Sequence, residues 1–383
     1  MPLFVGYTEK GGMNHVHELG SFREYVAACG SAPSGAAPAF ALFEALEHYF
    51  QVGGGRCGVL SLGHYEDFPI DGKLSPVLRA VPWVQVAGEV PRCTLLAVPD
   101  LRLLDGQDGS EWVSAWRELL KPLVHEWRML VVLDGPEEPD TLARCLKDIA
   151  GESFANLARG ALYWPRLLTE NQQHGRRAPL PCSAAVVAMM QRTDQERGIW
   201  KAPANELLPR VLRPSQDRRL PQEPESASLN RIRSLPRRGV RVWGDRTLLP
   251  ETASFASPWR YVQVRRTATH VQASLCELVR FALFEPNNAI TWIKLEGVMR
   301  VWLRKLWQAG GLAGREEREA FRIRVGLNQS MTQQDLQQGL LIVETHLALQ
   351  APAEFIELHI QLQSGDAQVT AWMSAANLSE VRL

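Results

Sequence analysis

Two aspartates follow apolar runs of the sequence, at places where an α/β enzyme carries catalytic or metal-binding carboxylates. Asp100 comes after the apolar run 93–98, and Asp134 comes directly after the run 129–133. Ligands of parallel α/β sheets bind beyond the carboxyl ends of the strands, so the two carboxylates could hold Mg²⁺ or exchange protons with a substrate. Aspartate after a strand also serves as a turn or helix-capping residue. The sequence favours this structural role, and an α/β nucleotide-binding or hydrolytic enzyme that uses both aspartates stays as the alternative.

Other patterns that could carry chemistry lack a feature that the chemistry needs. The glycines at 53–55 precede an expected strand, whereas a phosphate-binding loop leads into the N-terminus of a helix. His15 and His17 have no second ligand pair at zinc spacing. Ser183 lacks the flanking glycines of a hydrolase nucleophile elbow. We therefore expect no catalytic residues, no cofactor and no bound metal.

The composition favours association with other proteins. The chain of 383 residues carries 42 basic and 42 acidic side chains, so its formal net charge is zero. A neutral chain is not drawn to nucleic acid or to an anionic membrane by its overall field, and low net charge favours self-association. Twelve tryptophans also favour protein interfaces, because Trp buries a large rigid area. No apolar run reaches the about 18 residues of a membrane-spanning helix. The six scattered cysteines predict buried, reduced thiols of a protein made in the cytosol.

In the first half of the chain, strands and helices alternate. A capping pattern, Ser21 followed by Glu24, predicts a short helix that ends near Gly30. Apolar residues at helical spacing predict two more helices, at 38–50 and 112–127. Continuous apolar runs predict strands at 3–7, 56–62, 93–98, 129–133 and 161–164. Because these runs lack in-and-out alternation, we expect a mainly parallel sheet covered by helices on both faces, in an α/β domain at 1–212.

The second half begins with a change of composition. Four prolines lie among Arg, Ser, Gln and Glu at 213–238, which predicts a hinge loop between two domains. Beyond it, helical spacing predicts helices at 268–284 and 289–309. Apolar runs predict strands at 259–266, 320–325, 339–349 and 354–363. The region 239–383 is therefore predicted to be an α+β domain, with two helices against a small sheet.

Two groups of basic residues are candidates for partner binding. Arg300 and Arg304 are four residues apart on the predicted helix 289–309, so they share a face, and Lys305 lies beside them. Positive residues in excess favour an acidic partner surface here, and a solvated amphipathic helix is the alternative. The second group comprises the arginines at 231, 233, 237 and 238. Acidic neighbours, Glu223 and Glu225, favour the acidic surface of a neighbouring protein over nucleic acid.

The segment 192–205 packs charge, Gly, Trp and Pro into one run with neither helical nor strand periodicity, which predicts an ordered loop. Its charges alternate in sign, which suits salt bridges within the loop or between subunits. The segment resembles the signature loop of contractile tail-sheath proteins, which occur in phage tails and phage-like injection systems. Further segments resemble the same family in the same order along nearly the whole chain: 4–10, 53–57, 94–100, 161–165, 238–248, 259–266, 284–288, 306–314, 331–336 and 352–355.

The resemblance implies a structural subunit, assembled in the cytoplasm of the producing cell, of a phage tail or a released extracellular injection particle. Such subunits stack around an inner tube, with an outer N-terminal domain and an inner C-terminal domain, and contraction drives the tube through a target envelope. Strands from neighbouring subunits complete the small inner sheet, since an open sheet edge presents unpaired backbone groups. The expected partners are other sheath subunits, the inner tube protein and baseplate proteins, without nucleic acid and without insertion into a membrane.

Three sets of contact residues follow from the resemblance. The inner-tube contact is expected at Arg300, Arg304 and Lys305. Strand exchange between subunits is expected at Glu354, Phe355, Ile356, Leu358 and Ile360. Lattice contacts of the signature segment are expected at Arg192, Asp194, Arg197, Trp200, Lys201 and Asn205.

One departure from the family pattern concerns the start of the chain. Only Met1, Pro2 and Leu3 precede the first matched segment, where the family usually has an extended arm. This predicts a specialised ring at one end of the sheath, such as one beside the baseplate, which has one neighbouring layer fewer. A baseplate protein that reused the sheath fold is a third possibility, which its copy number and position in the particle would distinguish.

Overall fold

A computed structural model describes the chain except for residues 34–39, 91, 122–128, 171–178, 219, 221–224, 253–256, 351–354, 364–367 and 376–383. The described residues form two compact units. Unit 1 comprises residues 1–197 and 201–252, and unit 2 comprises residues 198–200 and 257–375.

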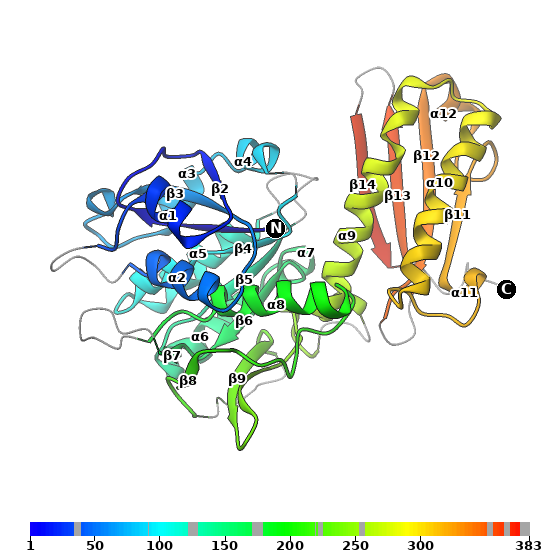
Figure 1. The fold of residues 1–383 in the computed structure, drawn as a ribbon. Coiled ribbons are helices and arrows are strands. Elements are labelled where there is room, and N and C mark those ends of the chain that lie inside the picture. The colour runs from blue at the N-terminus through cyan, green and yellow to red at the C-terminus, as the bar shows by residue number, and fades with distance from the viewer. Residues whose placement is uncertain are drawn as a thin grey trace. The chain divides into compact units, whose positions relative to one another are not determined.

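Unit 1 is built on an eight-stranded sheet (Figure 1). Its strands are β1 Pro2–Thr8, β2 Val16–Leu19, β3 Cys57–His64, β4 Leu95–Ala97, β5 Leu130–Asp134, β6 Gly160–Trp164, β9 Leu229–Leu235 and β10 Gly239–Trp243. Their spatial order is β10-β9-β6-β5-β4-β1-β3-β2. The strands from β9 to β3 run parallel, and β10 and β2 join the two ends in antiparallel pairing. The prediction of a mainly parallel sheet is thus confirmed.

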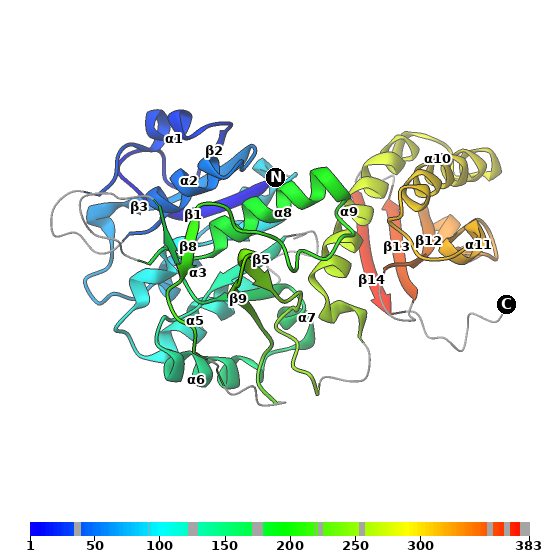
Figure 2. The ribbon, with the colours of Figure 1, turned by 60° about the horizontal axis from the view of Figure 1, so that its bottom comes forward.

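Helices cover both faces of this sheet (Figures 1 and 2). On one face, α2 Leu42–Gln51 and α8 Ser183–Arg197 pack against each other and against the central strands. On the other face, α5 Gly109–Leu120 packs beside α6 Pro139–Ile149. The shorter elements are α1 Phe22–Cys29, α3 Ser75–Ala80, α4 Trp83–Glu89, α7 Phe154–Leu157, η1 Tyr65–Asp67 and η2 Pro99–Leu104, with β7 Leu167–Thr169 and β8 Val211–Pro214 as a separate two-stranded sheet.

Local signals in the sequence set the ends of several helices. Ser21 Oγ accepts the backbone N–H of Glu24 at 3.2 Å, so α1 begins at the predicted cap, and it ends at Gly30. The helix predicted at 38–50 is α2, and it begins later, at Leu42. The second half of the helix predicted at 112–127 lies outside the described residues.

The predicted hinge at 213–238 is wrong as a domain boundary. Strand β9 lies inside this segment and pairs in parallel with β6, and the hairpin β9–β10 therefore belongs to the large sheet. Burial alternates along β9, so its sequence looks polar although every second side chain faces the interior. The first unit therefore extends to residue 252, whereas the predicted end of the first domain was residue 212. The main part of unit 2 is described from residue 257, whereas the predicted start of the second domain was residue 239.

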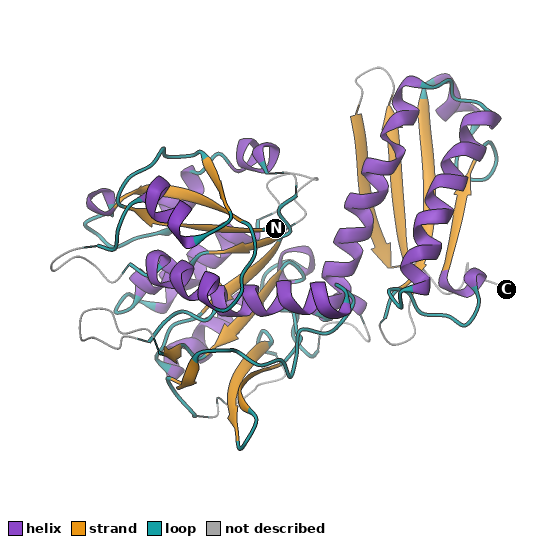
Figure 3. Ribbon diagram, viewed as in Figure 1, coloured by secondary structure: helices purple, strands orange, loops and turns teal. Residues whose placement is uncertain are grey.

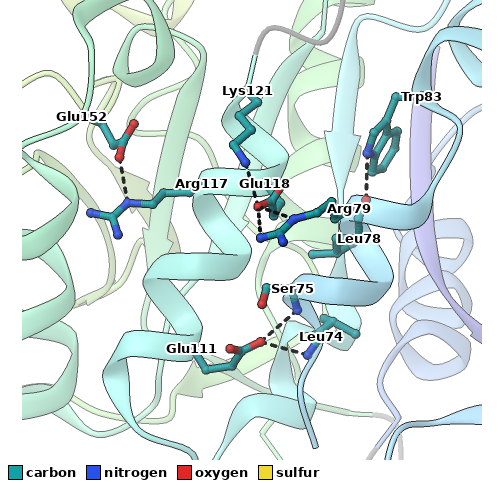
Figure 4. Close-up of polar contacts among 10 residues, drawn as sticks. All are labelled: Leu74, Ser75, Leu78, Arg79, Trp83, Glu111, Arg117, Glu118, Lys121 and Glu152. Carbon is teal, nitrogen blue, oxygen red and sulfur yellow. Dashed lines mark hydrogen bonds and ion pairs between the residues drawn. The ribbon is translucent and has the colours of Figure 1, made fainter.

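Charged side chains of α5 hold the neighbouring elements α3 and α7 (Figure 4). Glu111 Oε1 accepts the backbone N–H groups of Leu74 at 3.1 Å and Ser75 at 2.9 Å, which satisfies donors at the start of α3. Arg117 donates to Glu152 at 2.7 Å, just before α7. These contacts orient the helix layer on this face of the sheet.

Glu118, also on α5, is the buried centre of a charge cluster, and its replacement by glutamine is expected to destabilise unit 1. Its Oε1 accepts from Arg79 at 2.8 Å and from Lys121 at 2.8 Å, and its side chain is 7% exposed. Burial disfavours the carboxylate, but the two cations outweigh burial and lower the pKa of Glu118. Glu118→Gln should therefore reduce the free energy of unfolding by about 1–2 kcal/mol near neutral pH.

The pH dependence of this effect has a definite sign. Because the folded-state pKa of Glu118 is lowered, its contribution is present above the unfolded-state pKa and is lost as the pH falls through the folded-state value. Urea titrations at about pH 7 and about pH 3 measure it, with the exposed Glu66→Gln as a control. An equal loss of stability at both pH values would contradict the charge cluster as the cause.

Unit 2 combines two long helices with a four-stranded antiparallel sheet (Figures 1 and 3). The helices are α9 Val262–Val279 and α10 Ala289–Gln308. The strands, in spatial order, are β11 Phe321–Val325, β12 Leu340–Ala348, β13 Phe355–Gln363 and β14 Gln368–Ala375. Short elements complete the unit: η3 Pro258–Arg260, η4 Arg280–Phe284, α11 Glu317–Ala320 and α12 Gln333–Gln337. The prediction of two helices and a small sheet is confirmed, and β14 is an additional strand.

The prediction of a strand at 259–266 is wrong, because residues 262–266 form the first part of α9. Its valines and aromatic residues suit a strand by propensity. In the structure, Val262, Arg266 and Thr269 are 0, 4 and 5% exposed, at the i, i+4, i+7 spacing of one helix face. Burial of this face overrides the local propensity.

Candidate assembly surfaces

The signature segment 192–205 is helical in its first part. Residues 192–197 form the end of α8, and residues 198–205 form a loop, so the prediction of a loop over the whole segment is wrong for its first six residues. The helix ends where Gly198 adopts φ 91°, a conformation that side-chain-bearing residues resist. The ring of Trp200 also occupies the place that a Cβ on Gly198 would need. Glycine is therefore required at this turn.

The end of the segment covers an edge of the sheet in unit 1. Asn205 donates its backbone N–H to the carbonyl of Val242 at 2.7 Å, and Val242 donates to the carbonyl of Glu206 at 3.1 Å. Arg197 forms an ion pair with Glu206 at 3.2 Å. The stretch 205–208 thus acts as an extra strand beside β10, which removes a free edge from the sheet.

The other predicted lattice residues are Arg192, Asp194, Trp200 and Lys201. Arg192 donates to the carbonyl of Leu207 at 2.7 Å, which anchors the stretch 205–208 to α8. Asp194, Trp200 and Lys201 are partly buried. Contacts with other subunits stay a prediction for all of these residues.

The predicted basic face of α10 is largely neutralised within the chain. Arg300 donates to Glu296 at 2.5 Å and to Glu317 at 3.0 Å, and Arg304 donates to Glu317 at 2.5 Å. The structure brings both arginines together, as their spacing indicates, but with carboxylates between them. Lys305 is exposed, and no carboxylate among the described residues lies within ion-pair distance of it. The two arginines therefore offer little net charge to a partner.

An apolar stripe, which the sequence analysis missed, runs along the outward face of α10. Ile290, Ile293 and Val301 are 66, 72 and 53% exposed. Gly297 lies among them, and a Cβ built there would meet no atom within 4 Å. We call these four residues the α10 stripe. A glycine inside an exposed helix costs about 0.5–1 kcal/mol relative to alanine, and contiguous exposed apolar side chains are typical of binding surfaces. The i, i+3, i+7, i+11 spacing was the available signal in the sequence.

The residues predicted for strand exchange lie in β13, which is an inner strand of the sheet in unit 2. β13 pairs with β12 along its whole length and with β14 on its other side. Leu358 and Ile360 are fully buried, and Phe355 and Ile356 lie in the same strand. Glu354 lies outside the described residues. A strand that adds to this sheet as it stands would add beside β11 or beside β14.

Asp100 joins β1 to the start of α2. Its side chain is fully buried, and Oδ2 accepts the backbone N–H of Tyr7 at 2.7 Å. Oδ1 accepts those of Ala41 at 2.6 Å and Leu42 at 2.9 Å. A Cβ on Gly6 would lie 2.5 Å from the same carboxylate, so glycine lets it approach the strand. The carboxylate has the capping role that the sequence favours.

Asp134 serves the start of α8 in the same way. Its Oδ1 accepts the backbone N–H of Ser183 at 3.0 Å and lies 3.3 Å from the thiol of Cys182. Burial raises the pKa of Asp134. Each aspartate thus caps a helix N-terminus and is buried within the chain. A buried carboxylate that already binds backbone N–H groups is not available to a substrate or a metal ion, which disfavours the enzyme alternative.

The remaining candidate motifs have structural surroundings. The glycines at 53–55 lead into β3, as predicted. The six cysteines are free and buried, and burial raises the pKa of Cys29 to about 11 and of Cys57 to about 12, which makes these thiols unreactive. No three His, Cys, Asp or Glu side chains in the described part of the chain are grouped so that they could hold a metal ion. Of the helices described, none is long and apolar enough to cross a membrane.

No protein-family model matches this sequence, and no curated protein matches it either. Solved structures do match. A chain in the cryo-EM structure of the anti-feeding prophage (AFP) baseplate in its contracted state is 34% identical, with a TM-score of 0.78 over 92% of this chain and 90% of that one. A chain of the AFP helical sheath in the contracted state is 31% identical, with a TM-score of 0.70 over the same shares. The sheath tail protein Lin1278 from Listeria innocua shares the fold, with 10% identity and a TM-score of 0.63 over 99% of this chain and 95% of that one.

Proposed function

Because this chain belongs to the family of sheath proteins of contractile injection systems, we propose that it assembles around an inner tube and contracts to drive that tube through a target envelope. It is a structural protein and not an enzyme. The observation that carries the proposal is the 31% identity to a chain of the AFP helical sheath over 92% of this chain, which includes parts of both units.

Within the particle, we place the chain in a ring close to the baseplate. Two of the similar chains come from AFP baseplate structures, and one of them has the higher identity, 34%, and the higher TM-score, 0.78. The other baseplate chain, with 29% identity and a TM-score of 0.71, is about as similar as a chain from the AFP helical sheath, with 31% identity and a TM-score of 0.70. The higher similarity to the first of these chains supports a baseplate-proximal ring, or a baseplate protein with the sheath fold.

The inner tube is proposed to cover α10. Exposed isoleucines and a valine make the α10 stripe an exposed apolar surface, and Lys305 adds a positive charge near the C-terminal end of the helix. Because Glu296 and Glu317 already neutralise Arg300 and Arg304, the contact is expected to depend on apolar burial more than on these two arginines. A tube surface with an apolar patch and an acidic group beside it fits this chemistry.

Neighbouring subunits are proposed to join through the sheet of unit 2. Among the described strands, β11 and β14 end the sheet, so each presents backbone groups that a neighbour's strand can pair with. We propose β11 as the accepting edge and β14, the last described strand, as the donated one. Leu358 and Ile360 would then stay in the core of the subunit's own sheet.

Cryo-EM of particles from cells that produce this chain tests the proposal. The expected result is density for the chain in a ring around the tube, next to the baseplate, and no contraction-competent particle when its gene is deleted. A chain that is absent from the purified particles would overturn the sheath function. A chain that repeats along the whole sheath would overturn the end-ring position and leave the sheath function standing.

A further inference from the structure

The hairpin β9–β10 in unit 1 presents a basic face. Cross-strand pairing puts Arg233 opposite Arg241 and places Trp243 on the same face as Arg241. The covering stretch 205–208 adds Leu207 beside Arg241. Arg237 and Arg238 at the tip are exposed, and Trp243 and Leu207 are 45 and 40% exposed. We call the following residues the basic ribbon: Leu207, Arg233, Arg237, Arg238, Arg241 and Trp243.

The basic ribbon keeps an arrangement that costs stability. Like charges directly opposite each other on antiparallel strands are destabilising, and Arg233 and Arg241 form such a pair. In the described part of the chain, no carboxylate lies within ion-pair distance of either one. The guanidinium of Arg241 is held in place by the carbonyls of Arg238 at 3.0 Å and Asn205 at 2.5 Å. Arginine and tryptophan dominate binding hot spots, so the ribbon fits an anionic partner with some apolar surface.

The same sheet carries an acidic edge at the carboxyl ends of β3, β4 and β5. Glu66 follows β3, Asp108 precedes α5 in the connection after β4, and Asp140 lies in the first turn of α6 after β5. All three are exposed, and no cation among the described residues lies within ion-pair distance of them. β3, β4 and β5 run parallel in one sheet, with β1 between β4 and β3, so the three carboxylates lie at the same edge of that sheet. We call Glu66, Asp108 and Asp140 the acidic edge.

We propose that the basic ribbon of one copy of this chain binds the acidic edge of the next copy. The two surfaces are opposite in charge and lie on one unit, so the ribbon of one copy can meet the acidic edge of the next in a head-to-tail contact. A contact between two different surfaces repeats around a ring or along a helix instead of closing as a pair. The inference rests on the proposed sheath function, and it assigns the lateral contact between outer domains to these residues.

Charge reversal tests the contact in the assembled particle. Arg233→Glu with Arg238→Glu reverses the ribbon, and Glu66→Lys with Asp140→Lys reverses the acidic edge. Each pair is expected to reduce the copies of the chain per purified particle at least about tenfold, because like charges then meet across the contact. All four substitutions together should restore incorporation, since the two surfaces are complementary again. Quantitative mass spectrometry of particles from complemented cells measures the copies.

Controls separate the possible failures. Arg233→Glu places a carboxylate opposite Arg241, so we expect the purified ribbon variant to melt no lower than wild type. A melting temperature at or above that of wild type would exclude misfolding as the cause of lost incorporation. If the wild-type chain enters the particles and both charge-reversed variants enter them in the same copy number, the contact is disproved while the sheath function stands. Two results together would overturn the proposal and assign the ribbon to nucleic acid. In the first, double-stranded DNA binds the wild-type chain but not the ribbon variant. In the second, the fourfold variant does not restore incorporation into the particles.

Discussion

Replacing Asp100 with asparagine is expected to lower the free energy of unfolding by about 2–4 kcal/mol. The side chain is fully buried, and its two oxygens accept three backbone N–H groups, from Tyr7, Ala41 and Leu42. An amide keeps one acceptor oxygen and turns an NH₂ group toward a backbone donor, so at least one buried donor pair is left unsatisfied. Urea unfolding followed by tryptophan fluorescence measures the loss. Asp71→Asn, at an exposed aspartate, is the matched control and should change little.

The pH dependence distinguishes this carboxylate from a purely steric effect. Burial raises the pKa of Asp100 to about 6, although the three backbone donors act in the opposite direction. The folded chain therefore holds the proton more tightly than the unfolded chain, and the resulting stability is full below the unfolded-state pKa and lost as the pH rises through about 6. Asparagine does not titrate. The stability gap between wild type and Asp100→Asn should therefore widen as the pH is lowered from about 7 to about 4, and a constant gap would refute this explanation.

Ile293→Glu combined with Val301→Glu is expected to abolish co-assembly with the inner tube protein and to leave the folded monomer intact. Both side chains are mostly exposed, so the change does not touch the core of unit 2. Under a tube surface, the two new carboxylates would be buried without partners, at a cost of several kcal/mol each. Co-sedimentation with tube protein and thermal melting of the isolated chain give the two measurements. Ile70→Glu, the same change at a fully exposed site of unit 1, should co-assemble as wild type does.

Gly297→Ala adds one methyl group to the α10 stripe and is expected to have opposite effects on the stability of the monomer and on co-assembly with the tube. Gly297→Ala is expected to stabilise the monomer by about 0.5–1 kcal/mol, because the new Cβ meets nothing and alanine favours a helix. The same methyl would obstruct a tube side chain seated over Gly297, so co-assembly should weaken. Gly88→Ala in α4 also points into open space and should stabilise the monomer without this loss. Equal co-assembly of the two variants would exclude a close approach at Gly297.

Continuous apolar runs were sufficient to find the core of unit 1. The runs at 3–7, 56–62, 129–133 and 161–164 became β1, β3, β5 and β6 within two residues at each end. A strand buried on both faces needs apolar residues throughout, so its composition alone reveals it. The role of Asp100 also followed from its place after such a run, but its partners Ala41 and Leu42 lie 59 and 58 residues away and could not be named from the sequence.

Edges and surfaces were harder to predict, because there only half of each element faces the core. β9 was assigned to a hinge since every second residue is polar, and only its pairing with β6 reveals the strand. The charged end of α8 was interpreted as a loop for a related reason: its last residues lie beyond the buried part of the helix. Alternation and charge carry less information than continuous apolar runs, so the tertiary partner decides.

The sequence by itself determined that 289–309 forms a helix with two faces, because the spacing of apolar and charged residues is a local property. Which face is available to a partner was decided only by the tertiary structure. Arg300 and Arg304 look like a free basic surface in the sequence, yet Glu317, the first residue of the separate helix α11, lies within hydrogen-bond distance of both. Ion pairs between residues 13 and 17 positions apart depend on how the chain folds back on itself. For that reason the two arginines, although their side chains are 39 and 46% exposed, carry little free charge, and the apolar stripe is the surface of α10 that is left for a partner.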